Sequence, residues 1–159
     1  MPPQDTNYDL ALIRWGCQTL IESAQLLGID DELRPRWQEV LARLTPYPAD
    51  GNGFMIGADT PYAQSHRNYS HPLMVYPLHL VTWDQPESRD LVTKPVARWY
   101  ALTGAQRGHS YTGAASIYAT TGDGERGACR RPRARRSAPT SPSAFPQAVL
   151  SPIRPRSRP

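Results

Sequence analysis

The chain has 159 residues, a formal net charge of +4 and two cysteines. This length suits a single domain, and two cysteines exclude a disulfide framework and a cysteine-rich metal cluster. No apolar run reaches the roughly 18 residues that a membrane-spanning helix needs, and no basic segment followed by an apolar one opens the sequence. We therefore expect neither a membrane partner nor a signal peptide. Localisation and oligomeric state stay open, and a secreted parent enzyme is compatible with the sequence.

The positive charge is concentrated at one end of the chain. Residues 127–159 contain eight arginines, seven prolines and no acidic residue, so this tail carries +8 and residues 1–126 carry −4. Too few apolar residues are present in the tail to offset the entropy of ordering it. The sequence therefore predicts a body over residues 1–126 and a disordered basic tail over residues 127–159.

The arginine content also indicates an origin for the tail. The chain contains 17 arginines and a single lysine, Lys94, a bias that is typical of a GC-rich gene. An out-of-frame reading of such a gene is rich in Arg, Pro, Ala, Ser and Gly, which is the composition of the tail. We expect the tail to be translated from a shifted reading frame that begins after residue 126.

The body shows apolar residues at spacings of three and four, which is the pattern of amphipathic helices. Five helices are predicted in this way, over residues 9–27, 32–44, 70–81, 86–102 and 112–121. A sixth helix is expected to start at residues 123–126, and a short strand at 53–57 within a long loop over 47–62. The predicted fold class is therefore all-α.

Prolines and tryptophans refine this prediction. Pro35 fits the first turn of the second helix, where its missing N–H costs nothing. Pro77 is expected to kink or break the third helix, and Lys94-Pro95 interrupts the apolar pattern of the fourth. The first helix is apolar nearly all round, so we expect it to be buried between neighbouring helices. The predicted core includes three tryptophans on apolar helix faces, Trp15, Trp37 and Trp99.

The segment from Asp59 to His71 gathers two histidines, an arginine, an asparagine and two tyrosines just before an apolar run. Aromatic faces stack on the C–H face of a sugar ring, while Arg, Asn and His donate hydrogen bonds to hydroxyls. A few convergent polar groups on a largely apolar wall make a binding pocket for a small polar molecule. The segment therefore predicts a pocket for a neutral polyol.

Two short motifs in this body resemble a known family. The wording Ser65-His-Arg-Asn-Tyr-Ser-His71, followed by Tyr76-Pro77, resembles the Ser-His-Arg-His-x-Ser-His-Leu…Tyr-Pro element of the family 95 glycoside hydrolases. A second motif, Tyr111-Thr-Gly-Ala-Ala-Ser-x-Tyr-Ala119, supports the wider superfamily of six-hairpin glycosidases. The resemblance covers about residues 7–126. It implies a C-terminal piece of an α-L-fucosidase-type enzyme, folded as part of an (α/α)6 barrel.

The resemblance and the residue types together give a set of candidate sugar-binding residues. In the family, the Arg of the first motif and the His after it line the sugar pocket; here these positions are Arg67 and Asn68. On one helix His66 and His71 would be about 140° apart, so no shared metal is expected, and no cofactor is predicted. The candidate substrate-binding residues are Tyr62, His66, Arg67, Asn68, Tyr69, His71, Trp83 and His109.

Catalysis by a glycosidase normally needs two carboxyl groups. Asp59 is the candidate that the residue pattern offers, although an aspartate in a turn or at a helix N-cap fits the same position. The resemblance implies a general acid upstream of this chain and a base just before the last motif. At that second place the chain has Gly104-Ala-Gln-Arg-Gly-His-Ser110, with no carboxylate, and His109 is the group there that can transfer a proton.

Three functions follow from these observations. The first is a fragment of an inverting glycosidase that acts on glycans and is inactive as an isolated piece. The second is a non-catalytic carbohydrate-binding or degenerate relative, which Asn68 and the missing carboxylate favour. The third is nucleic-acid binding through the arginines of the tail alone, which would be non-specific and salt-dependent. A carbohydrate is the partner that the first two functions share.

Overall fold

A computed structural model of the chain describes residues 4–128, and these residues form an all-α fold with one minimal β-hairpin. The helices are α1 (Asn7–Leu26), α2 (Arg34–Arg43), the 3₁₀ turn η1 (Pro86–Ser88), α3 (Arg89–Ala101), α4 (Gly108–Thr120) and α5 (Gly124–Gly127). Strands β1 (Ala49–Asp50) and β2 (Gly53–Phe54) pair antiparallel, with Ala49 opposite Phe54. The predicted all-α class is confirmed. None of the helices within residues 4–128 is long and apolar enough to cross a membrane.

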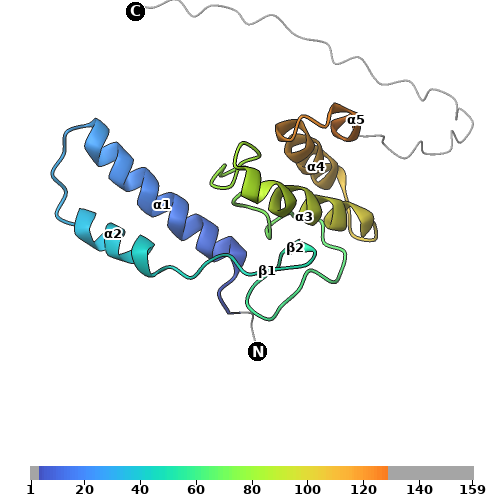
Figure 1. Ribbon diagram of the computed structural model, residues 1–159, viewed down its shortest axis with the longest axis horizontal. Helices are drawn as coiled ribbons and strands as arrows, with labels where there is room; N and C mark the ends of the chain where they lie inside the picture. The colour runs from blue at the N-terminus through green and yellow to red at the C-terminus, as the bar shows by residue number, and fades with distance from the viewer. Residues whose placement is uncertain (1–3, 129–159) are drawn as a thin grey trace, which may run out of the picture.

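The first two helices form a hairpin that stands to one side of the other helices (Figure 1). The Thr6 hydroxyl caps α1 by accepting from the Asp9 N–H at 3.1 Å, and Gly28, with φ of +65°, follows its end. Pro35 lies in the first turn of α2, as predicted. The predicted helices over 9–27 and 32–44 are therefore confirmed to within two residues at each end.

A fully buried asparagine joins this hairpin to the rest of the fold. The Asn7 side chain donates to the Pro48 carbonyl at 2.8 Å and to the Met55 carbonyl at 2.7 Å, while its backbone N–H donates to the Ile56 carbonyl at 2.9 Å. Buried polar groups are costly unless they are paired, so these bonds fix the start of α1 on the loop around β2.

The expectation that the first helix is buried between neighbours is wrong for the described residues. The side of α1 toward α2 and the loops is covered, but the opposite side is open, and Trp15 is 44% exposed. Trp37 is half-buried and only Trp99 is fully buried, so the prediction that all three tryptophans belong to the core holds for one of them. The apolar residues left exposed on α1 are Tyr8, Leu12, Ile13, Trp15, Leu20 and Leu26.

The main core lies between α3, α4 and the segment before α3. Its fully buried centre is formed by Met74, Val92, Val96, Trp99 and Ile117. Figure 1 shows α3 and α4 next to each other, with β2 close to α3. This core, rather than the α1–α2 hairpin, supports the polar loop over residues 59–71.

The predicted helix over residues 70–81 is absent, and the segment is a series of turns. The first turn is helix-like, because Val75 and Tyr76 both donate to the Pro72 carbonyl at 2.9 and 3.2 Å. Pro77 has no N–H to continue the ladder and disfavours helical geometry at the residue before it. Leu80 and Val81 then both donate back to the Met74 carbonyl, at 2.7 and 3.1 Å. The chain folds over itself where a helix was expected.

The predicted helix over residues 86–102 is present as η1 and α3, and it is continuous through Lys94-Pro95, where the apolar pattern is interrupted. Helix α3 runs through Pro95, which is buried against Gly53 of β2. A Cβ at Gly53 would lie 2.5 Å from the Pro95 ring, and Gly53 has φ of +100°, so only glycine fits there. The close packing of β2 on the proline ring offsets the hydrogen bond that α3 loses.

The last two helices agree with the prediction in kind. Helix α4 begins four residues earlier than the predicted 112, because the Ser110 hydroxyl accepts from the Arg107 backbone N–H at 3.1 Å and the Ser110 N–H donates to the Arg107 carbonyl at 2.9 Å. Helix α5 starts where the sixth helix was expected, capped by Asp123, which accepts from the Arg126 N–H at 3.0 Å. Of the predicted disordered tail over residues 127–159, residues 129–159 lie outside the described residues, and Gly127 is the last residue of α5.

Candidate functional site

A pocket of about 420 Å³ opens in the loop between β2 and the core. Cavities of about 300–1,000 Å³ are the usual size for small-molecule sites. Every lining side chain is uncharged or a histidine, and no carboxylate, lysine or arginine of the described residues takes part. The lining residues are Ile56, Thr60, Pro61, Tyr62, Ala63, Gln64, Ser65, His66, Ser70 and His71.

Hydrogen bonds to the helices hold the backbone of this loop. The Ser65 hydroxyl donates to the Leu102 carbonyl at 2.6 Å and accepts from the Ala105 N–H at 2.7 Å. The Trp99 indole N–H donates to the His66 carbonyl at 2.7 Å. The Ser110 hydroxyl of α4 donates to the Arg67 carbonyl. Three consecutive loop residues are therefore held by α3, α4 and the connection between them.

Two stacked rings form one wall of the pocket. The Tyr62 and His71 rings lie 4.2 Å apart between centroids, at an interplanar angle of 19°. The Tyr62 hydroxyl accepts from the His66 backbone N–H at 3.1 Å, which ties the wall to the loop. Burial raises the pKa of Tyr62, and the hydrogen bond from His66 opposes part of that shift. Tyr62 therefore stays a neutral aromatic platform.

His71 is the most unusual polar group of the pocket. It is 3% exposed, and no group within residues 4–128 hydrogen-bonds to its Nδ1 or its Nε2 with ordinary geometry. Burial lowers the pKa of His71 to about 3, the backbone of Pro95 raises it in part, and the charge of His66 lowers it further. The ring is therefore neutral at physiological pH, with one donor and one acceptor nitrogen.

His66 is oriented by its own loop. Its Nδ1 lies 3.2 Å from both the backbone nitrogen and the carbonyl oxygen of Asn68, so it accepts or donates according to the tautomer. The side chains of Arg67 and Asn68 are exposed and are not part of the pocket lining. Of the three adjacent candidates His66, Arg67 and Asn68, only His66 borders this pocket.

Tyr69 and His109 lie together outside the pocket. Their rings stack at 5.0 Å, and Tyr69 also meets Trp99 edge-on at 5.5 Å. A Cβ at Gly113 would collide with the Tyr69 ring, so Tyr69 packs directly on the α4 backbone. Burial raises the pKa of Tyr69. This arrangement is that of a core contact, with His109 on its exposed side.

Trp83 borders a different and smaller cavity of about 180 Å³, together with His79 and Asp84. The Arg89 guanidinium lies 5.3 Å from the centre of the Trp83 ring and covers it. The structure therefore divides the predicted residues among four places, with Arg67 and Asn68 exposed, and Tyr62, His66 and His71 are the three that share one pocket.

No carboxylate among residues 4–128 lines the pocket. Asp59 is exposed, has φ of +56° and precedes the lining residue Thr60 without lining the pocket itself. Among residues 4–128, no group of three or more His, Cys, Asp or Glu side chains is placed to hold a metal ion. Nothing in the described part of the chain pairs two carboxyl groups across the pocket.

Several lining residues were not singled out from the sequence. Ser65 and Ser70 belong to the quoted motif, so their hydroxyls could have been predicted to line the pocket. Nothing in the sequence distinguishes Thr60 and Gln64, because isolated polar residues in a loop are usually surface groups. They line the pocket only through the path of the loop.

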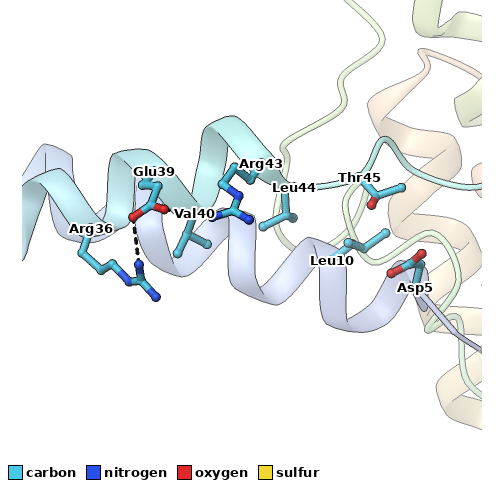
Figure 2. Close-up of a pocket in the computed structure, with 8 residues that line it drawn as sticks. All are labelled: Asp5, Leu10, Arg36, Glu39, Val40, Arg43, Leu44 and Thr45. Atoms are coloured by element: carbon cyan, nitrogen blue, oxygen red, sulfur yellow. Dashed lines mark hydrogen bonds and ion pairs between the residues drawn. The ribbon is translucent and has the colours of Figure 1, made fainter.

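A second hollow lies between α1 and α2 and is about 360 Å³ in volume (Figure 2). Its main polar feature is Glu39, which pairs with Arg36 at 2.8 Å and with Arg43 at 3.0 Å. These two hydrogen bonds, Arg43 first, lower the pKa of Glu39. These ion pairs lie on an exposed helix surface. The hollow has no aromatic residue in its described lining, unlike the Tyr62 pocket.

An all-α domain with a neutral, aromatic-walled pocket has the features of a domain that handles uncharged polyols. The family model of the glycosyl hydrolase family 95 catalytic domain matches residues 3–138. The chain belongs to this family, which makes it a glycoside hydrolase domain with a carbohydrate substrate. The match runs past residue 126, so the domain boundary expected there stays a prediction. A comparison with curated proteins finds no similar sequence.

Proposed function

We propose that this chain forms a sugar-binding wall in an inverting glycosidase of the α-L-fucosidase type. The observation that carries the proposal is the pocket walled by the Tyr62–His71 stack, whose described lining includes no carboxylate, lysine or arginine. An aromatic platform with hydroxyl, amide and imidazole groups around it suits a neutral sugar ring. A charged sugar would lose its hydration here without gaining an ionic partner.

The lining also favours a 6-deoxy sugar over its hydroxylated counterpart. Ile56, Pro61 and Ala63 contribute apolar surface to the same pocket that Ser65 and Ser70 make polar. A methyl group gains from contact with such apolar surface, whereas a hydroxyl placed there would need a new partner. This supports a fucose-type ligand over a galactose-type one.

The catalytic carboxyl groups are proposed to come from outside this pocket lining. An inverting glycosidase needs a general acid and a general base about 6.5–9.5 Å apart across the scissile bond. No carboxylate of the described residues lines the pocket, and residues 104–110 contain none. We therefore propose that the isolated chain binds sugar and hydrolyses no glycoside.

A non-catalytic sugar-binding role is the second candidate. The same missing carboxylates favour it, together with Asn68 at the position where the quoted family motif has a histidine. Both candidates predict sugar binding, and they differ in whether the complete protein turns over a glycoside.

Binding and turnover are tested separately on the whole chain. Protein-observed NMR titrations with methyl α-L-fucoside, methyl α-L-galactoside and methyl β-D-glucuronide should show binding in the order fucoside, galactoside, glucuronide. Parallel assays with an aryl α-L-fucoside should show no release of the aryl group. Preferential binding of the glucuronide would contradict the neutral pocket, and turnover abolished by Asp59→Asn would make Asp59 catalytic.

A further inference from the structure

Neither ring nitrogen of His71 makes a hydrogen bond of ordinary geometry with a described residue, although the ring is almost completely buried. The great majority of buried polar side-chain atoms in folded proteins have a hydrogen-bond partner. The same ring borders the pocket and is fixed in a stack with Tyr62. An unpaired buried nitrogen destabilises the fold, and this one is held rigidly beside a cavity. Its position indicates that a bound ligand provides the missing hydrogen-bond partner.

The neighbouring backbone determines which kind of partner fits. Proline has no backbone N–H, so the Pro95 backbone group that raises the pKa of His71 can only be its carbonyl oxygen, a hydrogen-bond acceptor. This carbonyl favours the tautomer whose N–H points toward it. In a neutral imidazole the other nitrogen then carries a lone pair.

Stacking sets the direction of that lone pair. Hydrogen bonds to an imidazole nitrogen lie in the plane of the ring, and the small angle of 19° keeps this plane nearly parallel to the Tyr62 ring. A ligand group that bonds to His71 must therefore approach its edge, beside the Tyr62–His71 stack rather than above it.

We propose that His71 selects the sugar by accepting a hydrogen bond from one ligand hydroxyl through its unprotonated ring nitrogen. The inference rests on the proposed function, because it assigns a specificity-determining residue to that same pocket. It further requires that the recognised position be a hydroxyl, because an ether, a carboxylate or a hydrogen has no proton to donate.

A panel of deoxy sugars tests this assignment on the whole chain. The probes are methyl α-L-fucoside and its 2-, 3- and 4-deoxy analogues, titrated into the wild-type protein and into His71→Phe. One analogue should bind the wild type about tenfold more weakly than the parent, which is the usual effect of losing one hydrogen bond to a neutral group. That same analogue and the parent should bind His71→Phe equally, because the variant has no acceptor to lose.

His71→Phe keeps an aromatic ring on Tyr62 and removes both unpaired nitrogens. Its melting temperature should therefore stay equal or rise while its affinity for methyl α-L-fucoside falls about tenfold. His79→Asn is the matched control, because His79 lies outside this pocket and has φ of +51°, which asparagine tolerates. It should leave all four affinities unchanged.

The wild-type protein gives an independent readout if the variant does not fold. The chain has four histidines, so its imidazole ¹⁵N spectrum is simple to assign by substitution. Addition of methyl α-L-fucoside should shift one His71 nitrogen, and the 2-, 3- or 4-deoxy analogue that lacks the recognised hydroxyl should not.

The outcomes separate the two levels of the proposal. Sugar binding with unmoved His71 nitrogens, or with equal deoxy losses in wild type and variant, would overturn the role of His71 and leave the sugar pocket intact. Absence of binding by all four sugars would overturn the proposed pocket, and the assignment of His71 with it.

Discussion

The Tyr62 and His71 rings stack at 4.2 Å, although eight intervening residues separate them in the sequence. The loop between them is fixed at His66 and Arg67 by the side chains of Trp99 in α3 and Ser110 in α4. It is fixed at Ser65 by backbone groups of the connection between these helices. The stack is therefore supported by the main core, which gives a loop site the rigidity that selective binding requires.

Replacing Tyr62 by alanine should weaken sugar binding. The change removes the platform of the pocket and the acceptor for the His66 N–H, so affinity for methyl α-L-fucoside should fall at least about tenfold. Tyr47→Ala is the control, because Tyr47 is also a partly buried tyrosine, packed on Phe54, but does not line the pocket. Both variants should lose stability, and only Tyr62→Ala should lose binding. Equal losses of affinity would mean that the effect is one of folding.

Trp99 should stabilise both the core and the loop. Trp99→Phe removes the hydrogen bond to the His66 carbonyl and part of a fully buried side chain, so the free energy of unfolding should fall by about 1–3 kcal/mol. Trp15→Phe on the exposed side of α1 should change it by less than about 0.5 kcal/mol. Urea unfolding of the two variants checks this. A larger loss in Trp15→Phe would show that α1 is covered in solution.

Two glycines should respond to alanine in opposite directions. Gly53→Ala forces a Cβ into Pro95 at a backbone φ of +100°, and should destabilise the protein by about 1–3 kcal/mol. Gly16 lies inside α1, and no described atom outside its own helix turn lies within 4 Å of the position that a Cβ would take there. Gly16→Ala should therefore stabilise the protein by up to about 1 kcal/mol. Thermal unfolding of both variants measures the contrast. A neutral Gly53→Ala would contradict the close packing of β2 on α3.

The burial of His71 should make stability fall with acidity. The unfolded ring takes up a proton near pH 6.5, but the folded ring only near pH 3. Between these values the unfolded state binds more protons, so the free energy of unfolding decreases as the pH is lowered. From about pH 7 to about pH 5 this group alone should remove about 2 kcal/mol. Urea unfolding of wild type and His71→Phe isolates it, because the variant should lack this part of the pH dependence. Parallel profiles would show that the pKa of His71 is the same in the folded and unfolded protein.

The sequence predicted the helices whose start, end and buried face are determined by nearby residues. Apolar spacing, a glycine after the last turn of α1 and a proline in the first turn of α2 are all visible in the sequence, and together they predict both helices. The segment over residues 70–81 has the same spacing but folds into turns, because Pro77 breaks the ladder and the Met74 carbonyl captures later N–H groups. Such a capture depends on the path of the chain, which spacing does not reveal.

The site could be predicted only in part for the same reason. Tyr62, His66 and His71 are near in sequence and share one pocket, so composition was enough to group them. Tyr69 lies between them but packs on Gly113 of α4, a contact that is decided by tertiary structure. The unpaired nitrogens of His71 were equally invisible, since burial and missing partners exist only in the folded chain.

The central claim is that the pocket beside the Tyr62–His71 stack binds a neutral sugar. A crystal structure of the chain with methyl α-L-fucoside tests it most directly. The account predicts sugar density beside Tyr62, with a hydroxyl within hydrogen-bond distance of a His71 ring nitrogen. Density at Trp83 or in the hollow between α1 and α2, with the Tyr62 pocket holding only solvent, would contradict it.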